Sequence, residues 1–351
     1  MEKDLILDHA LRYPQAQVQD FLKLLFQQEF GCGHLITDNG KSLEMLGREL
    51  SQLHDPAAVP LIEPIGNGLC RLYLQALFQT GLSIKTFQRF FCLTANQPQG
   101  TVDGFLKKAQ IFKRICEDGH IGLDLEDIDL FLTQWEASGY GPFRHSESYR
   151  ESYHPAYRVV HEDFCEFLPL FAKIDGLLEE NNSVTVSIDG DSAAGKTTLA
   201  ARLKDVYDCN VIHMDHFFLQ PAQRTPERLQ EIGGNLDYER FLADVVSPLK
   251  EGREVVYQPF NCQHGALEAP IHLKTNPLTI IEGVYSQHPR FGPSDLNVFL
   301  SLPKAEQLSR IKSRNGEKML KRFINEWIPM EKAYFQKFSI PQYADFVVKR
   351  K

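Results

Sequence analysis

The sequence predicts a two-part chain, in which an all-α N-terminal domain precedes an α/β domain with a doubly wound, mainly parallel sheet. Three observations support this prediction. Residues 1–178 carry apolar residues at helical spacing and show no strand-like alternation of useful length. Residues 179–351 alternate strand and helix patterns five or six times. Asn181-Asn182-Ser183, polar and turn-prone, marks the boundary between the two parts.

Composition narrows the class of protein. At 351 residues the chain is long enough for two domains, and its hydrophobic (43%) and charged (24%) fractions are typical of a soluble globular protein. The net charge of −8 disfavours nucleic acid or an anionic membrane as the main partner, because phosphate binding needs a basic face. No run approaches the roughly 20 apolar residues of a membrane span, and the acidic start does not resemble a signal peptide. The seven cysteines lack C-x-x-C spacing and suit a reducing compartment, so we expect a cytoplasmic protein.

The first half reads as a series of helices. A break falls at Asn96–Gly100, where Pro and Gly interrupt the pattern, and Gly81 stands at a C-cap-like position. Apolar stripes at 3–4 spacing predict helices within 18–26, 43–53, 69–78 and 87–93, and further helices are expected at 102–117, 124–137 and 160–179.

Two stretches of this half hold chemically versatile side chains. Gly31-Cys32-Gly33-His34 places a nucleophile beside a base, but we favour a tight helix–helix corner over a Cys/His site. Tyr149–Arg158 is aromatic and basic, and it is either an arm that covers the neighbouring domain's pocket or, as we favour, a packed interdomain connector. The role of the helical half is left open.

The clearest motif opens the second half. Val184, Val186 and Ile188 alternate with polar residues like a strand, and G-x-x-x-x-G-K-T then leads into a helix. This is the pattern of a phosphate-binding loop, whose backbone N–H groups and helix N-terminus surround a nucleotide's phosphates. Its lysine reaches the β- and γ-phosphates and the following threonine ligates Mg²⁺. The predicted nucleotide contacts are Gly190, Asp191, Ser192, Ala193, Ala194, Gly195, Lys196, Thr197 and Thr198.

Acidic residues end two later strands of this half. Asp215 follows a short buried strand, at the edge of an α/β sheet where ligands bind. It can accept a proton from a substrate hydroxyl or hold Mg²⁺ through water, and the alternative is a helix N-cap. We interpret the neighbouring His213 as a core residue and His216 as a rim residue. Glu282 ends the strong strand 277–281 and is expected to face Mg²⁺ or its water shell.

The remaining elements suggest an acceptor loop and a lid. Ile232–Asp237 is a Gly-rich polar loop suited to a sugar, although Asp237 could equally cap the helix expected at 238–250. Pro303 opens a helix that carries Arg310 and Arg314 one turn apart, either to close over a triphosphate or as a solvated helical face. Strands are expected at 254–257, 295–302 and 343–348.

Together these motifs resemble the uridine kinase family, in the P-loop group that includes phosphoribulokinase and bacterial pantothenate kinase. The resemblance covers about 180–350, and it is carried by Gly190–Thr198, Asp215–Phe218, Asn235–Asp237, Ile281–Tyr285 and the helix of the two arginines. It implies that Asp215 is the base for the acceptor hydroxyl and that Asp237 contacts sugar hydroxyls. It also implies that Glu282 lies on the Mg²⁺ side and that Arg310 and Arg314 are lid arginines.

The sequence departs from that family where the acceptor binds. Phe218 stands where uridine kinases usually have Tyr, and Phe260–Gly265 replaces their base-recognition stretch Tyr-Asp-Phe…His-Ser-Arg. His264 takes the base-binding place, but the acid and the arginine of that stretch are absent. We therefore expect phosphoryl transfer to an acceptor whose site includes Phe218, Asp237, His264 and Tyr285.

The leading hypothesis is a kinase that uses ATP or GTP with Mg²⁺ to phosphorylate a hydroxyl of a nucleoside or related sugar-containing metabolite. Its expected partner is a small-molecule substrate, and the sequence does not decide between a monomer and a homo-oligomer. The alternative is a nucleotide-gated switch or assembly protein whose helical half binds a protein. No guanine-reading Asn-Lys-x-Asp motif follows the loop, which disfavours a GTPase switch. A third hypothesis is a bifunctional enzyme whose helical half has its own activity.

Overall fold

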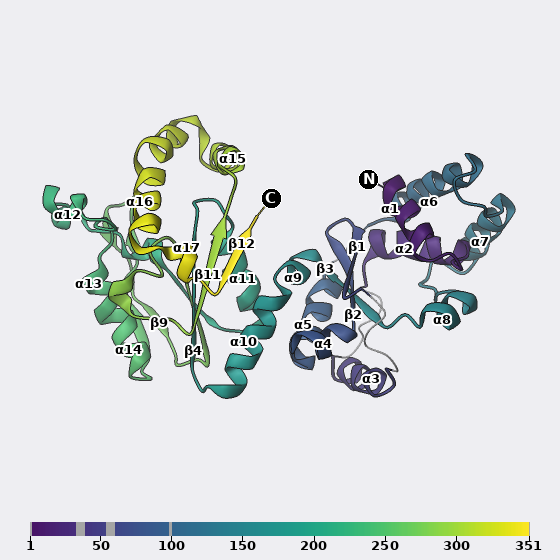
Figure 1. Cartoon of the computed structure of the whole chain (residues 1–351), viewed down its shortest axis with the longest axis horizontal. Coiled ribbons are helices and arrows are strands. Elements are labelled where there is room, and N and C mark those ends of the chain that lie inside the picture. The colour runs from purple at the N-terminus through teal and green to yellow at the C-terminus, as the bar shows by residue number, and fades with distance from the viewer. Residues whose placement is uncertain (1, 33–38, 54–59, 98–99, 351) are drawn as a thin grey trace. The chain divides into compact units, whose positions relative to one another are not determined.

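The structure is a computed structural model that describes residues 2–32, 39–53, 60–97 and 100–350. The chain forms two compact units, Met1–Asp175 and Gly176–Lys351 (Figure 1). The division falls within helix α10 (Leu168–Glu180), a few residues before the boundary expected at 178/179.

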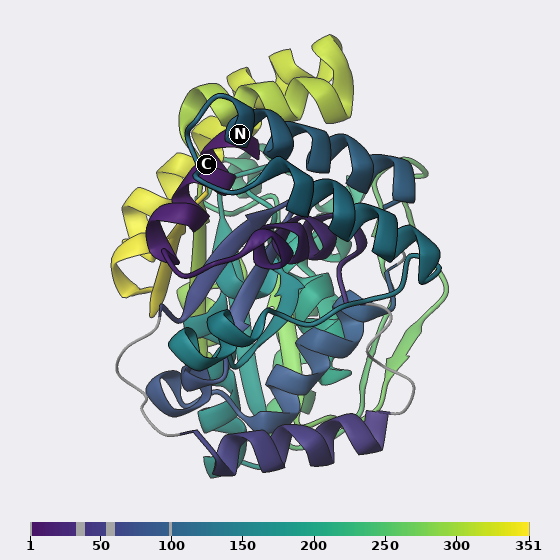
Figure 2. The same ribbon diagram turned by 90° about the vertical axis from the view of Figure 1, so that its right-hand side faces the viewer.

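The first unit is mainly helical, and α6 and α7 pack side by side across α2 (Figure 2). Phe21, Phe26, Phe105, Phe112 and Trp135 fill the core between these helices. Besides α10, the helices are α1 (Glu2–Arg12), α2 (Val18–Phe30), α3 (Asn39–Ser51), α4 (Gln75–Thr80), α5 (Ile84–Ala95), α6 (Val102–Glu117), α7 (Leu125–Ala137), α8 (Glu147–Tyr153) and α9 (Glu162–Glu166).

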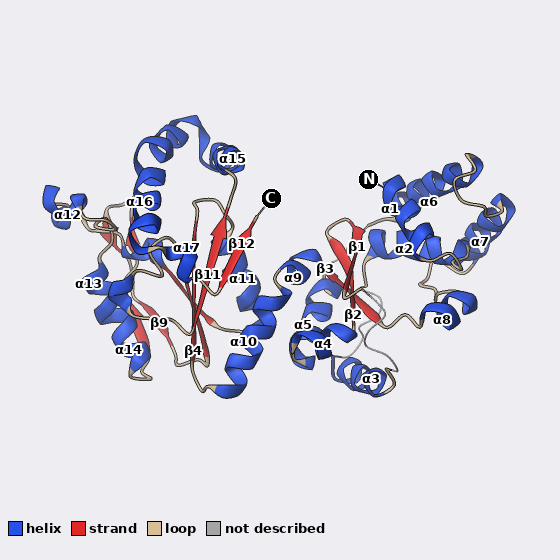
Figure 3. Ribbon diagram, viewed as in Figure 1, coloured by secondary structure: helices blue, strands red, loops and turns tan. Residues whose placement is uncertain are grey.

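A three-stranded antiparallel sheet corrects the all-α prediction for this unit. Strands β1 (Ile62–Gly66), β2 (Leu69–Tyr73) and β3 (Tyr157–His161) pair in that order (Figure 3). All five residues of β2 are buried, so no polar/apolar alternation marks the strand. The apolar residues of β2 and α4 together mimic the 3–4 spacing of one helix, so the helix predicted within 69–78 is wrong for residues 69–73. The helix expected at 160–179 likewise begins as the end of β3.

Two other predictions for this unit concern Gly81 and the stretch Gly31–His34. Gly81 has a φ of 76° and ends α4 in the left-handed conformation expected of a C-cap glycine. In the stretch Gly31–His34, Gly31 donates its N–H to the Gln27 carbonyl and Cys32 is buried. Gly33 and His34 lie outside the described residues.

The second unit is an α/β layer structure built on a five-stranded parallel sheet, as predicted. Its strand order is β12-β11-β4-β10-β5, with β4 in the centre. The strands are β4 (Val184–Gly190), β5 (Asn210–His213), β10 (Leu278–Glu282), β11 (Leu296–Ser301) and β12 (Phe346–Lys349). Because β4, β5 and β10 are parallel neighbours, their carboxyl ends meet at one edge.

Helices cover both faces of this sheet (Figure 1). Helix α11 (Lys196–Tyr207) packs against β4, β5 and β10 on one face. The other face buries Ile212, Ile281 and Phe299 against the helices that follow. These are α13 (Tyr238–Phe241), a π-turn (Leu242–Val246), α14 (Ser247–Lys250), α16 (Ile328–Phe338) and α17 (Ile340–Tyr343). Helix α15 (Lys304–Arg322) and a π-turn (Phe323–Trp327) precede α16 and form a separate small apolar cluster.

Smaller elements surround the sheet. The expected strand at 254–257 pairs outside the parallel sheet, as β6 (Val255–Tyr257) against β9 (Ile271–Leu273), and β7 (Phe260–Asn261) pairs with β8 (Ala266–Leu267). Helix α12 (Pro226–Gln230) lies in the loop after β5. Within the described ranges, each helix is too short or too polar to span a bilayer.

Gly190 is placed so tightly that a methyl group should not fit. Its φ is 137°, and a Cβ there would lie 2.0 Å from the Leu300 carbonyl oxygen. We expect Gly190→Ala to lower the free energy of unfolding by about 2 kcal/mol or more. Gly47 in α3 has a helical backbone and open space, so Gly47→Ala should instead add about 0.5–1 kcal/mol. Urea unfolding of the full chain compares the two, and equal stabilities would contradict this packing.

Candidate nucleotide and phosphoryl-transfer site

The phosphate-binding loop connects β4 to α11 at the carboxyl edge of the sheet. Gly190, Ala193 and Gly195 all have positive φ, at 137°, 63° and 94°. The loop therefore turns sharply between Gly190 and Gly195, and α11 begins directly at Lys196. The N-terminus of this helix and the loop's N–H groups provide the positive partial charge that an anion needs.

Lys196 and Thr197 carry the functional groups of this helix start. Lys196 Nζ donates to the carbonyl oxygens of Gly190 (2.8 Å) and Asp191 (3.0 Å), so the ammonium lies over its own loop. Thr197 Oγ1 donates to Glu282 Oε1 at 3.1 Å. The sequence-predicted loop residues and Glu282 are thus neighbours in space.

Thr197 and Glu282 fit Mg²⁺ better than a transition metal. Both offer hard oxygen atoms, and Mg²⁺ is commonly held by one or two protein oxygens together with substrate phosphates and water. Across the described residues, no group of three or more His, Cys, Asp or Glu side chains forms a metal-binding cluster. The donor set therefore suits a cation that arrives with a nucleotide.

His213 is part of this site, which corrects its interpretation as a core residue. Its side chain is 35% exposed, and Nδ1 lies 2.5 Å from Glu282 Oε1. The hydrogen bond to Glu282 raises the pKa of His213 above its usual value. In contrast, burial lowers the pKa of His216, whose Nδ1 lies 3.2 Å from the Tyr257 hydroxyl. The only sequence signal for a functional role of His213 is its position at the carboxyl end of a strand.

Asp215 directly follows β5 and Met214 at the same edge of the sheet. Its side chain reaches solvent, although protein atoms surround it closely. Burial and then the negative charge of Glu282 raise its pKa, while the charges of Lys196, His213 and Arg314 act in the opposite direction. The turn Met214–Phe217 is capped by His213 without a side-chain bond, so Asp215 does not serve as the helix cap that was its alternative. A carboxylate with a raised pKa is a stronger proton acceptor when ionised.

The four expected acceptor contacts are placed differently from one another. Asp237 is 3% exposed and caps α13, with its oxygens accepting from Arg240 N, Arg240 Nε and Gln223 Nε2. Tyr285, with a φ of 77°, is 3% exposed and lies in the hydrophobic core. Phe218 is half-buried and His264 is exposed in the turn between β7 and β8. In this structure Asp237 and Tyr285 are buried and have structural contacts, Asp237 as the cap of α13 and Tyr285 in the hydrophobic core.

The candidate lid arginines follow β11. Helix α15 lies at the end of the sheet where β11 finishes (Figure 1), and it kinks at Gly316, whose φ is 78°. Arg310 Nε pairs with Glu306 at 2.6 Å, and Arg314 Nε donates to Asn315 Oδ1 at 2.9 Å. The positive charge of Arg314 partly opposes the rise in the pKa of Asp215.

Helix α16 contributes contacts to the loop that sequence reasoning missed. Glu331 accepts from the Ser192 hydroxyl and from Ser192 N (3.2 Å), while Lys332 Nζ lies 2.7 Å from Asp191 Oδ1. Tyr334 donates its hydroxyl to Asp189 Oδ2 at 2.9 Å. Burial raises the pKa of Asp189 to about 6 and also raises that of Glu331. These residues follow the loop by about 140 positions and carry no local motif, so no sequence signal identified them.

Comparison with known proteins gives limited likenesses. No family model matches the chain, and no curated protein matches it. A solved structure described as a possible uridine kinase from Bacillus stearothermophilus aligns with 23% identity and a TM-score of 0.38, over 51% of this chain and 98% of that one. A structure described as a "putative fructose transport system kinase" from Silicibacter sp. TM1040 aligns with 20% identity and a TM-score of 0.41, over 50% of this chain and 97% of that one. At these TM-scores the likenesses do not establish a function for this chain.

Lys196 should be required for nucleotide binding. Removing its charge-assisted hydrogen bonds to phosphate should weaken binding of Mg-ATP roughly 10- to 100-fold. The measurement is isothermal titration of Lys196→Met. Lys204→Met on the exposed face of the same helix is the matched control and should bind like wild type. Equal affinities for all three proteins would argue against this role for the loop.

The His213–Glu282 pair should make stability depend on pH in a defined direction. A histidine pKa that is raised by folding contributes stability below the ordinary histidine pKa, and this contribution is lost as pH rises through the raised value. The difference in unfolding free energy between wild type and Glu282→Gln should therefore shrink from about pH 5 to about pH 9. NMR titration should show the pKa of His213 falling in Glu282→Gln. If the pKa of His213 is the same in Glu282→Gln and wild type, the hydrogen bond to Glu282 is not what raises it.

Proposed function

We propose that this protein is a P-loop kinase that transfers the γ-phosphoryl group of ATP or GTP to a hydroxyl of a nucleoside or related sugar-containing metabolite. The observation that carries the proposal is the placement of Asp215. Its carboxylate lies within the electrostatic reach of Lys196, Glu282 and Arg314, at the edge where the phosphate-binding loop ends. A switch protein needs the loop, but it does not need a solvent-accessible base beside it.

Phosphoryl transfer depends mainly on positioning and on neutralising charge. The loop's N–H groups and Lys196 would bind the donor's phosphates, and Mg²⁺ held from the side of Thr197 and Glu282 would neutralise their charge. Asp215 would orient the acceptor hydroxyl and take its proton. Arg314 would then stabilise negative charge on the transferring group and help exclude water.

Three arginines near the expected acceptor loop bond to main-chain carbonyl groups. Arg224 donates to the Leu219 carbonyl, and Arg228 donates to the carbonyls of Gly234 and Leu236. Arg240 donates to the carbonyls of His216 and Gln258. These three cations hold the loop between β5 and α13 in shape. This supports a neutral, hydroxyl-bearing acceptor, since they are already bonded to the main chain.

A metabolite screen tests the proposed function. Purified protein with Mg-ATP or Mg-GTP is incubated with nucleosides, pantothenate and sugars, and release of nucleoside diphosphate is measured. Mass spectrometry then identifies the product. A phosphorylated alcohol is the expected result. Absence of transfer to every acceptor, together with nucleotide-dependent binding of a protein, would favour the switch hypothesis.

Asp215→Asn should separate chemistry from folding. Loss of a general base typically lowers turnover by about 10²- to 10⁴-fold, and nucleotide binding should persist because the loop is unchanged. Asp208→Asn at the far end of α11 is a matched control, since asparagine tolerates its left-handed backbone, φ 51°. Steady-state kinetics on the acceptor found in the screen measures both variants. If Asp215→Asn turns over at the wild-type rate, another group is the base.

A further inference from the structure

The first unit contains a polar layer where a hydrophobic one would be expected. One stripe of α2 packs into the apolar core with α6 and α7. A second stripe, Asp20, Lys23 and Gln27, has the i, i+3, i+7 spacing of one helix face. Asp20 is 0% exposed and Gln27 is 7% exposed, so this polar face points into the protein.

The sheet presents polar residues to the same layer. Glu63 on β1 lies opposite Arg71 on β2, and Tyr73 on β2 lies opposite Tyr157 on β3. Arg71 is 0% exposed and its guanidinium stacks on the Tyr157 ring, 4.8 Å from the centroid. Buried ion pairs of this kind seldom improve stability over apolar packing, so their presence suggests another use.

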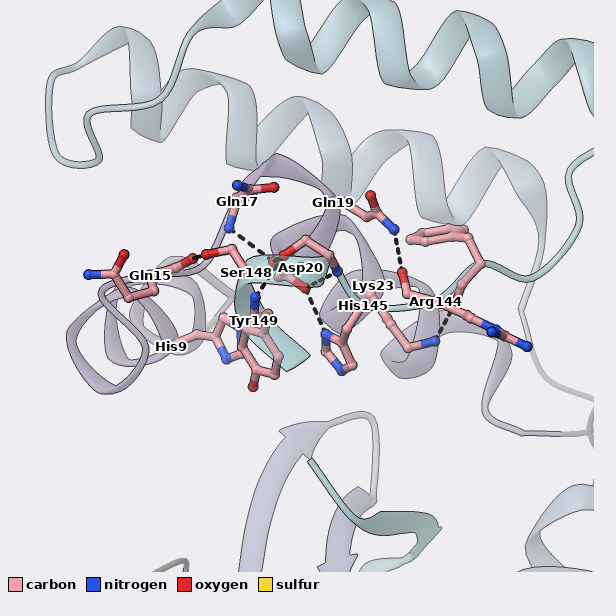
Figure 4. Close-up of polar contacts among 12 residues, drawn as sticks. His9, Gln15, Gln17, Gln19, Asp20, Lys23, Arg144, His145, Ser148 and Tyr149 are labelled. Atoms are coloured by element: carbon pink, nitrogen blue, oxygen red, sulfur yellow. Dashed lines mark hydrogen bonds and ion pairs between the residues drawn. The ribbon is translucent and has the colours of Figure 1, made fainter. Parts of the chain in front are cut away.

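A directed chain of hydrogen bonds crosses the layer from Arg71 to Asp20. Arg71 donates from Nε (3.0 Å) and Nη2 (2.8 Å) to Gln27 Oε1, and Gln27 Nε2 donates to the Tyr157 hydroxyl at 3.1 Å. The Tyr157 hydroxyl lies 2.6 Å from His145 Nε2. On the other side of the ring, His145 Nδ1 lies 2.8 Å from Asp20 Oδ1 (Figure 4). Burial lowers the pKa of His145 to about 4, so its neutral ring donates to Asp20 and accepts from Tyr157.

Asp20 completes this chain with every oxygen bonded. Besides His145, its carboxylate accepts from Gln17 N (Figure 4). It also accepts from Ser146 N and the Ser146 hydroxyl. These hydrogen bonds therefore fix the orientation of the Arg71 guanidinium through its Nε and Nη2 atoms. A guanidinium oriented in this way is ready to present its remaining edge to an anion.

Around Arg71, however, the layer is incompletely bonded. Its Nη1 lies 3.4–3.5 Å from the Glu63 oxygens, longer than the 2.7–2.9 Å typical of a charge-assisted pair. Glu63 Oε2 accepts from the hydroxyls of Tyr13 and Tyr73. Within the described part of the chain, Oε1 has only long contacts, to Arg71, His9 and Arg12. The Arg71–Glu63 ion pair is therefore longer than a well-formed arginine–carboxylate pair.

Two further side chains beside this pair have no hydrogen-bond partner among the described residues. Both ring nitrogens of His9 and the hydroxyl of Tyr149 are buried and unbonded. His9 Nδ1 lies 3.6 Å from Glu63 Oε1, beyond hydrogen-bond distance. The Tyr149 ring stacks between the two imidazoles, 4.2 Å from His145 and 6.1 Å from His9. Burying such groups unbonded costs free energy, so a purely structural network would have satisfied them.

We propose that this layer is a second small-molecule site, whose ligand carries an oxyanion next to a hydroxyl group. Arg71, His9 and Tyr149 supply donors for the oxyanion, and Glu63 Oε1 is an acceptor for the neighbouring hydroxyl. A carboxylate and a phosphate monoester share the required chemistry.

The layer must open for such a ligand to enter. His9, Arg71 and Tyr149 are each at most 2% exposed, whereas Tyr157 and Lys23 at the border of the layer are partly exposed. Ligand binding would then replace a partly satisfied, closed layer by a fully bonded one. This should appear as slower backbone hydrogen exchange in the surrounding elements.

The test uses the full chain and four probes. Lactate and glycerol 3-phosphate carry an oxyanion beside a hydroxyl, whereas acetate and inorganic phosphate carry the oxyanion alone. In hydrogen–deuterium exchange, lactate or glycerol 3-phosphate should protect peptides from α1, α2, β1, β2 and 143–161. Acetate should protect them less than lactate, and inorganic phosphate less than glycerol 3-phosphate. Lys196→Met should leave this protection unchanged, which separates it from anions bound at the phosphate-binding loop. Protection confined to the loop, or none with any probe, would overturn the proposal.

Tyr149→Phe is the decisive variant. Its hydroxyl bonds to no described residue, so the variant should fold and melt no lower than wild type. It should bind the protecting probe about tenfold more weakly or worse, since it loses a hydrogen bond to a charged group. Tyr140→Phe, which removes an exposed hydroxyl bonded to Glu136, is the control and should bind normally. Arg71→Lys should also weaken binding, and equal affinity of Tyr149→Phe and wild type would reject the site even if Arg71→Lys fails to fold.

Discussion

The carboxylate of Glu282 is the contact on which the candidate active site depends. It ends β10, which lies between β4 and β5, and it is only 5% exposed. It accepts from Thr197, at the start of the helix after β4, and pairs with His213, at the end of β5. A buried carboxylate is costly unless it is hydrogen-bonded. The register of three strands and the position of the phosphate-binding loop are therefore coupled through one side chain.

A second set of contacts joins the loop to the lid side of the unit. Helix α16 bonds Asp189, Asp191 and Ser192 through a tyrosine, a lysine and a glutamate in turn. Helix α16 continues from α15 through the π-turn Phe323–Trp327, so the segment that carries the candidate lid arginines also contacts the loop. Closure of α15 over a nucleotide would act on the loop through these bonds.

The two units place their polar groups by different rules. In the second unit, charged side chains gather at the carboxyl edge of a parallel sheet, where the strand ends leave room for a ligand. In the first unit, α2 turns one polar stripe inward against a polar sheet face, and the apolar core lies on its other side. The hydrogen-bond chain from Arg71 to Asp20 is directional throughout, and it orients a cation whose own pairing with Glu63 is loose. That arrangement is the basis of the second site that we propose for the first unit.

The sequence by itself determined the α/β class of the second unit and the location of its phosphate-binding loop. Both depend on local physics, because strand alternation and the conformational freedom of Gly190 and Gly195 act over a few residues. Asp215 and Glu282 were also accessible to sequence reasoning, since parallel strands bring their carboxyl ends together. Only the tertiary structure decided that His213 pairs with Glu282, that α16 holds the loop, and that β2 is a strand buried on both faces. These features come from contacts between residues tens to hundreds of positions apart, and no local period or motif encodes such contacts.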